Sequence, residues 1–220
     1  SRRQRQMCIR DRSLDAPVFT LTHAMGFKGV LGGEYNFNRT EASIWKRFWL
    51  PASWGKIDCS VKAGAEWNTV PFPLLILPEA NLSYITQRET FCLINNMEFL
   101  NDRFASMSIS YDMNGKLFNR IPLLKNLKWR EMFRVRALWG TLTDKNNPFK
   151  SSNPDLFRFP TRDGKFTSFV MDPKVPYVEA SVGIYNIFKL LHVEYVHRFT
   201  YRDNPGINKN GIRFMVLMVF

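Results

Sequence analysis

Apolar and polar residues alternate without exception between residues 57 and 67. One face of an extended strand here carries Ile57, Cys59, Val61, Ala63, Ala65 and Trp67, and the other carries Asp58, Ser60, Lys62, Gly64 and Glu66. Side chains of a β-strand point alternately to opposite sides, so this pattern predicts a strand with one apolar face and one polar face. Its length fits a tilted strand that crosses a lipid bilayer, which needs roughly 9–11 residues.

The same alternation recurs along the chain and predicts an all-β, antiparallel fold of about nine strands. The predicted strands are 18–25, 37–50, 57–67, 91–99, 105–112, 132–139, 178–184, 193–202 and 211–220. Asn101 and Asp102 predict a tight turn between the strands 91–99 and 105–112. The basic, leucine-containing stretch 114–129 is predicted to be an ordinary structured loop, with a helical turn at a membrane surface as the alternative.

The final strand is apolar to its last residue. Ile212, Phe214, Val216, Met218 and Phe220 share one face. A soluble sheet rarely leaves such a strand uncovered, whereas in a transmembrane barrel lipid covers the outer face. A closing strand with a terminal Phe resembles the insertion signal of bacterial outer-membrane barrels, which implies that role for Phe214, Val216, Met218 and Phe220. We therefore expect residues 14–220 to be the C-terminal part of an antiparallel transmembrane β-barrel, which by itself forms an open, curved sheet with an unpaired edge near 18–25.

Composition leaves two alternatives, a soluble chain and a chain that crosses a membrane as strands, and does not choose between them. Apolar residues make up 45% of the 220 residues, yet no run approaches the roughly 20 that a membrane helix needs. The net charge is +12, and part of it lies in the segment 1–13 (SRRQRQMCIRDRS). That segment has no periodicity and resembles the translation of a sequencing adaptor, so we treat it as non-native and leave it out of the fold argument.

The charged residues on the polar faces are expected to point into a wet barrel interior, because an Arg facing lipid near the bilayer centre costs about 2–4 kcal/mol. The candidate lumen-facing residues are Asp58, Lys62, Glu66, Glu98, Arg134, Arg136, Glu179, Glu194 and Arg198. If the chain ends at the periplasmic rim, counting strands backward places the connections 203–210, 142–174, 100–103 and 51–55 outside. The same count places 68–89, 114–129 and 185–191 in the periplasm.

No motif in the sequence indicates catalysis or a cofactor. The three histidines (His23, His192 and His197) and the cysteines lack metal-site spacing. Neither a nucleophile elbow nor a phosphate-binding loop occurs. We therefore predict a protein that is not an enzyme, with no metal, no cofactor and no nucleic-acid partner.

Several segments in order resemble one family of uncharacterised Gram-negative outer-membrane proteins, in which a barrel follows a carboxypeptidase-regulatory-like domain. They are GFKGVLGGEYNFNR (26–39), NTVPFPLLILP (68–78), FNRIPLLKNLKWRE (118–131), RALWGTLTDKNNP (136–148), YVEASVGIYNIFKLLHVEYVHRFTY (177–201) and GIRFMVLMVF (211–220). The family's barrel is similar in class to the surface-antigen barrels of outer-membrane assembly, although the sequence RALWG (136–140) only distantly resembles their Arg-Gly-aromatic motif.

The resemblance implies a location in the cell outer membrane and a role as a pore, transporter or surface-assembly scaffold. The implied partners are outer-membrane lipid, the barrel-assembly machinery during insertion, and missing N-terminal strands of the same barrel; periplasmic partners are left open. The alternative is a soluble lipid-binding β-barrel or sandwich, because alternation by itself does not tell which face is inside.

Overall fold

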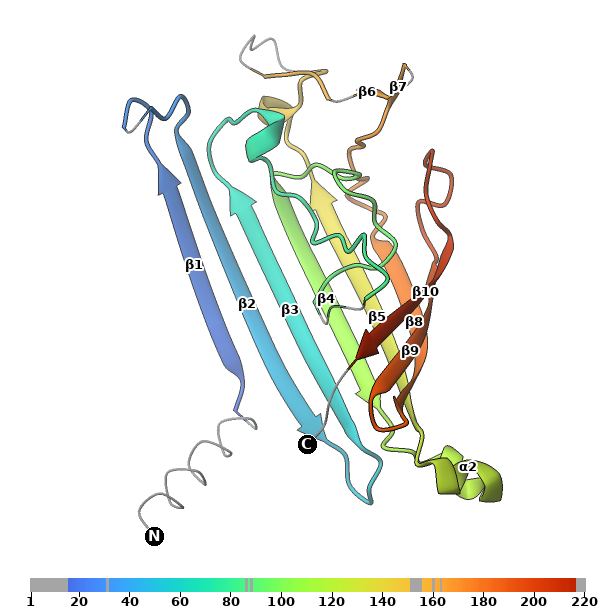
Figure 1. The fold of residues 1–220 in the computed structure, drawn as a ribbon. Coiled ribbons are helices and arrows are strands. Elements are labelled where there is room, and N and C mark those ends of the chain that lie inside the picture. Colours follow the sequence, from blue (N-terminus) through green and yellow to red (C-terminus); the bar gives the residue numbers. More distant parts are fainter. Residues whose placement is uncertain are drawn as a thin grey trace, which may run out of the picture.

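The computed structural model describes residues 16–30, 32–85, 87, 89–150, 156–159, 161–162 and 164–216. These residues form one antiparallel sheet of eight strands in the order β1-β2-β3-β4-β5-β8-β9-β10 (Figure 1). The strands are β1 (Val18–Gly26), β2 (Phe37–Trp49), β3 (Lys56–Glu66), β4 (Arg103–Asp112), β5 (Arg130–Thr141), β8 (Tyr177–Ile187), β9 (Leu191–Arg198) and β10 (Asn210–Val216). The predicted all-β antiparallel class is confirmed, and so is an open sheet with its first strand, β1, at an edge.

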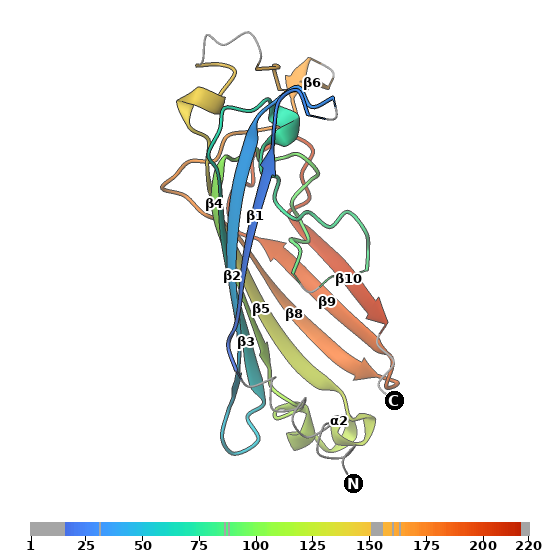
Figure 2. The same ribbon diagram turned by 90° about the vertical axis from the view of Figure 1, so that its left-hand side faces the viewer.

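The sheet is strongly curved. Figure 2 shows β8, β9 and β10 sweeping away from β1–β4, so that the sheet has a concave and a convex face. A register shift between Ile184 and Ile187 interrupts the β8–β9 pairing. Such bulges bend the strand and increase its local twist, which contributes to the curvature on this side of the sheet.

The predicted strand 91–99 is wrong, and so is the hairpin turn at Asn101 and Asp102. Instead, the whole connection 67–102 between β3 and β4 folds onto the concave face (Figure 2), and β4 pairs directly with β3. Phe91, Leu93 and Ile94 are all buried. These apolar residues suggested a strand, but they belong to an irregular connection. They are apolar because the connection buries them against the sheet, and they do not alternate between the two faces of a strand.

Removing that strand changes which connections share an end of the sheet. The connections 50–55, 113–129 and 188–190 lie at one end, which we call the short-connection end (Figure 1). The connections 27–36, 67–102, 142–176 and 199–209 lie at the other, the long-connection end. The predicted placement of 51–55 with 203–210 is therefore wrong, and so is that of 68–89 with 114–129. The prediction counted strands backward from the C-terminus and included the false strand 91–99, which reversed the predicted direction of every strand that precedes residue 91.

Helical structure is limited to single turns in the described ranges. The stretch 114–129 contains the 3-10 turn η3 (Phe118–Arg120) and the short helix α2 (Pro122–Leu127), so the prediction of an ordinary loop without helix is wrong for this stretch. Two more 3-10 turns, η2 (Phe72–Leu74) and η4 (Asp144–Asn146), and a small hairpin, β6 (Thr161–Arg162) with β7 (Lys165–Phe166), lie in the long connections. In the part of the chain that the structure describes, every helix is too short or too polar to cross a membrane.

The buried apolar core lies on the concave side, between the sheet and the long connections. One cluster contains Phe91, Ile94, Phe99, Leu138, Met171 and Tyr177, and a second contains Val70, Leu75, Leu100, Leu142 and Phe159. Edge-to-face contacts of Tyr177 with Phe91 and Phe99 join the connection 67–102 to β8. The core therefore holds this connection in place and leaves the convex face uncovered.

Gly55→Ala tests the tight turn between β2 and β3. Gly55 has φ +91°, and a Cβ atom there would lie 1.8 Å from the Asp112 carbonyl oxygen. We expect the free energy of unfolding in urea to fall by more than the roughly 1–2 kcal/mol that left-handed strain alone costs. Gly206→Ala is the control, since Gly206 has φ +72° but open space around it. Equal losses for both variants would contradict the close approach at Gly55.

Candidate functional site: the charged concave face

The concave face is charged because the polar phase of every strand points to it. One register row runs across six strands through Trp45, Ser60, Ser108, Arg136, Glu179 and Arg198. The next row contains Arg47, Asp58, Ser110, Arg134 and Ser181. Eight of the nine candidate lumen-facing residues are strand residues of this phase, namely Asp58, Lys62, Glu66, Arg134, Arg136, Glu179, Glu194 and Arg198; the ninth, Glu98, comes from the connection 67–102.

Glu179 on β8 is the centre of a buried network that holds the connection 67–102. Its carboxylate accepts hydrogen bonds from the backbone N–H of Cys92 (2.9 Å) and of Leu93 (3.1 Å). Arg136 Nη1 (2.9 Å) and the Tyr177 hydroxyl (2.9 Å) also donate to it. Glu179 is 1% exposed and Arg136 2%. The Glu179 carboxylate of this buried ion pair is hydrogen-bonded by four donors, whereas Nε and Nη2 of Arg136 have no hydrogen-bond partner among the described residues.

A second buried ion pair joins the same connection to β9. Arg198 Nη1 donates to Glu98 Oε2 at 3.0 Å, and its other nitrogens donate to the carbonyl oxygens of Thr200 and Tyr201. The guanidinium lies 4.8 Å from the centre of the Tyr177 ring, within the range of a cation–π contact. The structure thus brings Glu98, Arg136, Glu179 and Arg198 together around one segment.

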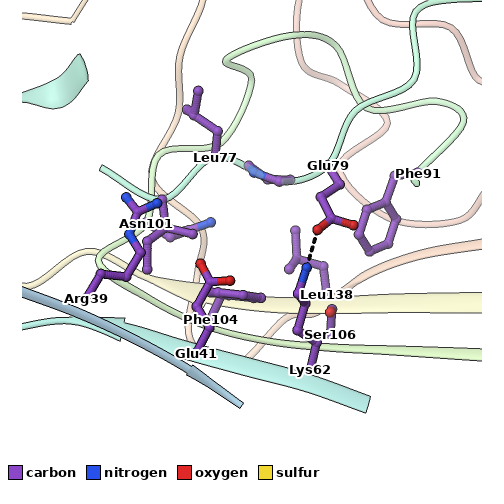
Figure 3. A pocket seen from close by; sticks show the side chains of 12 residues that line it. Arg39, Glu41, Lys62, Leu77, Glu79, Phe91, Asn101, Phe104, Ser106 and Leu138 are labelled. Atoms are coloured by element: carbon purple, nitrogen blue, oxygen red, sulfur yellow. Dashed lines mark hydrogen bonds and ion pairs between the residues drawn. The ribbon is translucent and has the colours of Figure 1, made fainter. Parts of the chain in front are cut away.

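The other candidates form separate pairs along the concave face. Arg134 binds Glu194 at 3.0 Å, and Ser181 and His192 also contact that carboxylate. On β3, Asp58 pairs with Arg47 of β2, and Glu66 accepts a hydrogen bond from the Asn38 N–H at 2.9 Å. Lys62 pairs with Glu79 of the connection 67–102, as the dashed line in Figure 3 shows. Asp58, Lys62 and Glu66 therefore do not join the cluster around Glu179.

A cavity of 620 Å³ lies on the concave face beside this network. It extends from β1 to β10, and its lining includes Trp45 and the serines Ser43, Ser60, Ser106, Ser108 and Ser110, together with several of the paired charges. A smaller cavity of 70 Å³, shown in Figure 3, lies under the connection near Lys62 and Glu79. Serine hydroxyls and paired ions share this lining with apolar side chains such as Phe91, Met132 and Met215, so the larger cavity is suited to polar or amphipathic solutes.

Sequence reasoning missed several contributors to this site, including Tyr177, whose hydroxyl donates to Glu179. Glu79 and Cys92 lie in the connection 67–102, where the sequence has no periodicity that predicts which way a side chain points. Each contacts the sheet through residues far away in the sequence, so spacing could not predict the contact. Arg47 lies on β2 in the polar phase, so the alternation that identified Asp58 could have found it.

The thiol of Cys92 is neutral in this network. Burial, above all, raises the pKa of the Cys92 thiol, which keeps it protonated at neutral pH; Cys92 and Cys59 are both free.

The convex face carries the apolar phase of the strands and is exposed. Its exposed residues include Phe19, Leu21, Ile44, Val61, Phe133, Val135, Val182, Tyr195, Ile212, Phe214 and Val216. Val61, at the middle of β3, is 46% exposed, and Val216 is 60% exposed. Of the predicted insertion signal, Phe214 and Val216 lie on this face, while Met218 and Phe220 lie outside the described residues.

The described residues contain no group of three or more His, Cys, Asp or Glu side chains placed to bind a metal ion.

A family model described as "Family of unknown function (DUF5686) C-terminal domain" matches residues 2–149, a range that includes β1 to β5. No curated protein and no solved structure matches the chain.

Glu179→Ala tests whether the network holds the connection 67–102 on the sheet. The substitution leaves Arg136 buried without its partner, so we expect the free energy of unfolding to fall by about 3–5 kcal/mol. Limited proteolysis should also cut within 67–102 faster than in the wild-type protein. Asp144→Ala is the control, because the Asp144–Lys150 pair is exposed and such pairs contribute about 0–1 kcal/mol. Unchanged proteolysis in Glu179→Ala would contradict the anchoring role.

Proposed function

Because the chain belongs to the DUF5686 family, a family of unknown function whose C-terminal domain it matches, we propose a function from the chemistry of its sheet. The sheet is part of the wall of a β-barrel in the outer membrane of a Gram-negative bacterium. Its role there is that of a non-enzymatic pore, transporter or surface-assembly scaffold. The convex face contacts lipid, and the concave face lines the lumen.

The distribution of charge between the two faces is the observation that carries this proposal. Valine, leucine and phenylalanine side chains are exposed over the convex face, while Arg136, Glu179 and Arg198 are buried on the concave face. In water this arrangement is unfavourable, because exposed apolar area costs roughly 25 cal/mol per Å². In a bilayer it is favourable, since lipid covers the apolar face and the ionised groups stay away from it.

The free edge of β1 supports a closed barrel in the full protein. β1 and β10 are the two ends of the strand order; Phe214 of β10 forms a bridge with Ile85 of the connection 67–102, and open sheet edges do not occur in the hydrocarbon region. We propose that additional strands of the same barrel pair with β1. The barrel-assembly machinery would insert the protein through the closing strand, whose Phe214, Val216, Met218 and Phe220 form the proposed signal.

The lengths of the connections support an orientation. Outer-membrane barrels have short periplasmic turns and longer extracellular loops. The connections 67–102 and 142–176 share the long-connection end, so we place that end outside the cell and the short-connection end in the periplasm. The connection 67–102 would then fold from the outside into the lumen and fill part of it.

The soluble lipid-binding alternative finds little support in the cavity. A soluble protein that carries lipid needs an apolar interior and a polar exterior. Here the lining of the larger cavity mixes serines and ion pairs with apolar side chains such as Phe91 and Met132, and the exposed face is apolar rather than polar.

Val61→Arg separates the membrane proposal from a soluble sheet. In water, Arg replaces an exposed Val at little cost; at the bilayer centre it makes folding into the membrane less favourable by about 2–4 kcal/mol. We expect the full-length variant to yield less folded, heat-modifiable protein in the outer-membrane fraction. Phe27→Arg, an exposed apolar position in the β1–β2 connection, should have no such effect. A soluble wild-type protein without heat-modifiable mobility would refute the proposal.

Electrical recording in planar bilayers separates a pore from a scaffold. Since the connection 67–102 occupies the concave face, we expect low conductance for the wild-type protein. Replacing residues 81–90 by two glycines should raise it, because this part lies beyond the Ala80–Phe91 bridge and includes Glu89 at the larger cavity. Asp144→Ala should leave conductance unchanged. Inserted protein without conductance in either form would exclude the pore and favour the scaffold.

A further inference from the structure

The three connections at the short-connection end form one continuous surface, which we call the basic end surface (residues 50–55, 113–129 and 188–190). Lys116 Nζ donates to the Ala52 carbonyl oxygen at 3.1 Å and lies 5.0 Å from the centre of the Trp54 ring. Asn186, directly before the third connection, donates to the Lys128 carbonyl oxygen at 2.7 Å. These contacts bring segments that are far apart in sequence onto the same end of the sheet, around α2 (Figure 1).

The charge of this surface has one sign. Its basic residues are Lys116, Arg120, Lys125, Lys128 and Lys189, and the sequence of the three ranges contains neither Asp nor Glu. The nearest carboxylates are already used: Asp112 pairs with Lys56 and accepts from the Tyr185 hydroxyl, and Glu131 accepts from the N–H groups of Leu117 and Phe118. The connections of the long-connection end, in contrast, include the acids Glu34, Glu79, Glu89, Asp144, Asp172 and Asp203.

Apolar side chains are exposed between these basic residues. Leu123 on α2 is 83% exposed and Phe188 is 84% exposed. Trp54, Leu117, Ile121, Leu127 and Leu190 are exposed as well. Such a combination of basic and large apolar side chains is typical of segments that lie in the headgroup region of a membrane, with the apolar groups dipping into the acyl boundary.

The position of the surface on the sheet identifies what covers it. Phe48, exposed near the end of β2 and on the same side of the strand as Ile44, continues the apolar convex face up to this end. The basic end surface therefore starts where the lipid-covered part of the strands stops. A bilayer that covers the convex face has its headgroups at this level, and an anionic headgroup is the complement of five basic residues without an acid.

We propose that the basic end surface binds the anionic headgroups of a phospholipid leaflet. The inference rests on the proposed function, since it requires the sheet to lie in a bilayer. It adds to that function the chemical class of the lipid at the periplasmic rim. It also adds a second feature, independent of loop length, that fixes the orientation of the sheet in the membrane. Each Lys near an anionic surface strengthens binding about fivefold, and salt screens the attraction over a Debye length of about 8 Å at physiological ionic strength.

The test measures lipid selectivity of the full-length protein in proteoliposomes. Electron paramagnetic resonance of spin-labelled phosphatidylglycerol and phosphatidylcholine gives their relative association constant with the protein. We expect selectivity for phosphatidylglycerol in the wild-type protein, and raising the salt concentration should weaken it. Lys125→Glu/Lys128→Glu should reduce it at the affected sites by more than about 25-fold, because two lysines are lost and each Glu also repels the headgroup. Lys165→Glu/Lys174→Glu changes the net charge equally at the long-connection end and should retain the selectivity.

The outcomes separate this inference from the function on which it rests. Protein that fails to insert and shows no heat-modifiable mobility would refute the barrel itself. Inserted protein that associates equally with both lipids, or an equal loss in both double variants, would refute the headgroup site alone. Loss of selectivity in millimolar inorganic phosphate at constant ionic strength would also overturn it, because the surface would then be a site for free phosphate.

Discussion

The structure depends on how the buried charges of the concave face are neutralised. Isolated buried ions are too costly to keep, so each needs a partner and further hydrogen bonds. Glu179 meets this requirement with Arg136, Tyr177 and two backbone N–H groups, and Glu98 meets it with Arg198. Two of these partners, the N–H groups of Cys92 and Leu93, come from the connection 67–102, as does Glu98 itself, so the sheet and the connection need each other.

This dependence gives the sheet its two different sides. On the concave side, the connection 67–102 satisfies the charges and supplies Phe91, Ile94 and Phe99 to the core. On the convex side nothing in the described residues covers Val61, Val135 or Val182. The proposed bilayer would supply there what a second sheet supplies in a soluble sandwich, a non-aqueous layer against the apolar phase of the strands.

A strand could be predicted from the sequence wherever the surroundings of one of its faces differ from those of the other. β3 and β5 alternate clearly because one face is exposed and apolar and the other charged, and so Asp58 and Arg134 were placed on the correct phase. The stretch 91–99 misled the same reasoning, because its apolar residues are buried on several sides of an irregular chain. That single error also reversed the assignment of 51–55 and 68–89 to the ends of the sheet.

The alternation of side chains is a local property with period two, so the sequence by itself determined the fold class, the two faces and most of the charged candidates. The partners of those charges were decided only by the tertiary structure. Cys92 and Glu179, which hydrogen-bond directly, are separated by 87 residues, and Glu98 and Arg198 by 100. No spacing rule links positions so distant, because what brings them together is the curvature of the whole sheet and the packing of a long connection within it.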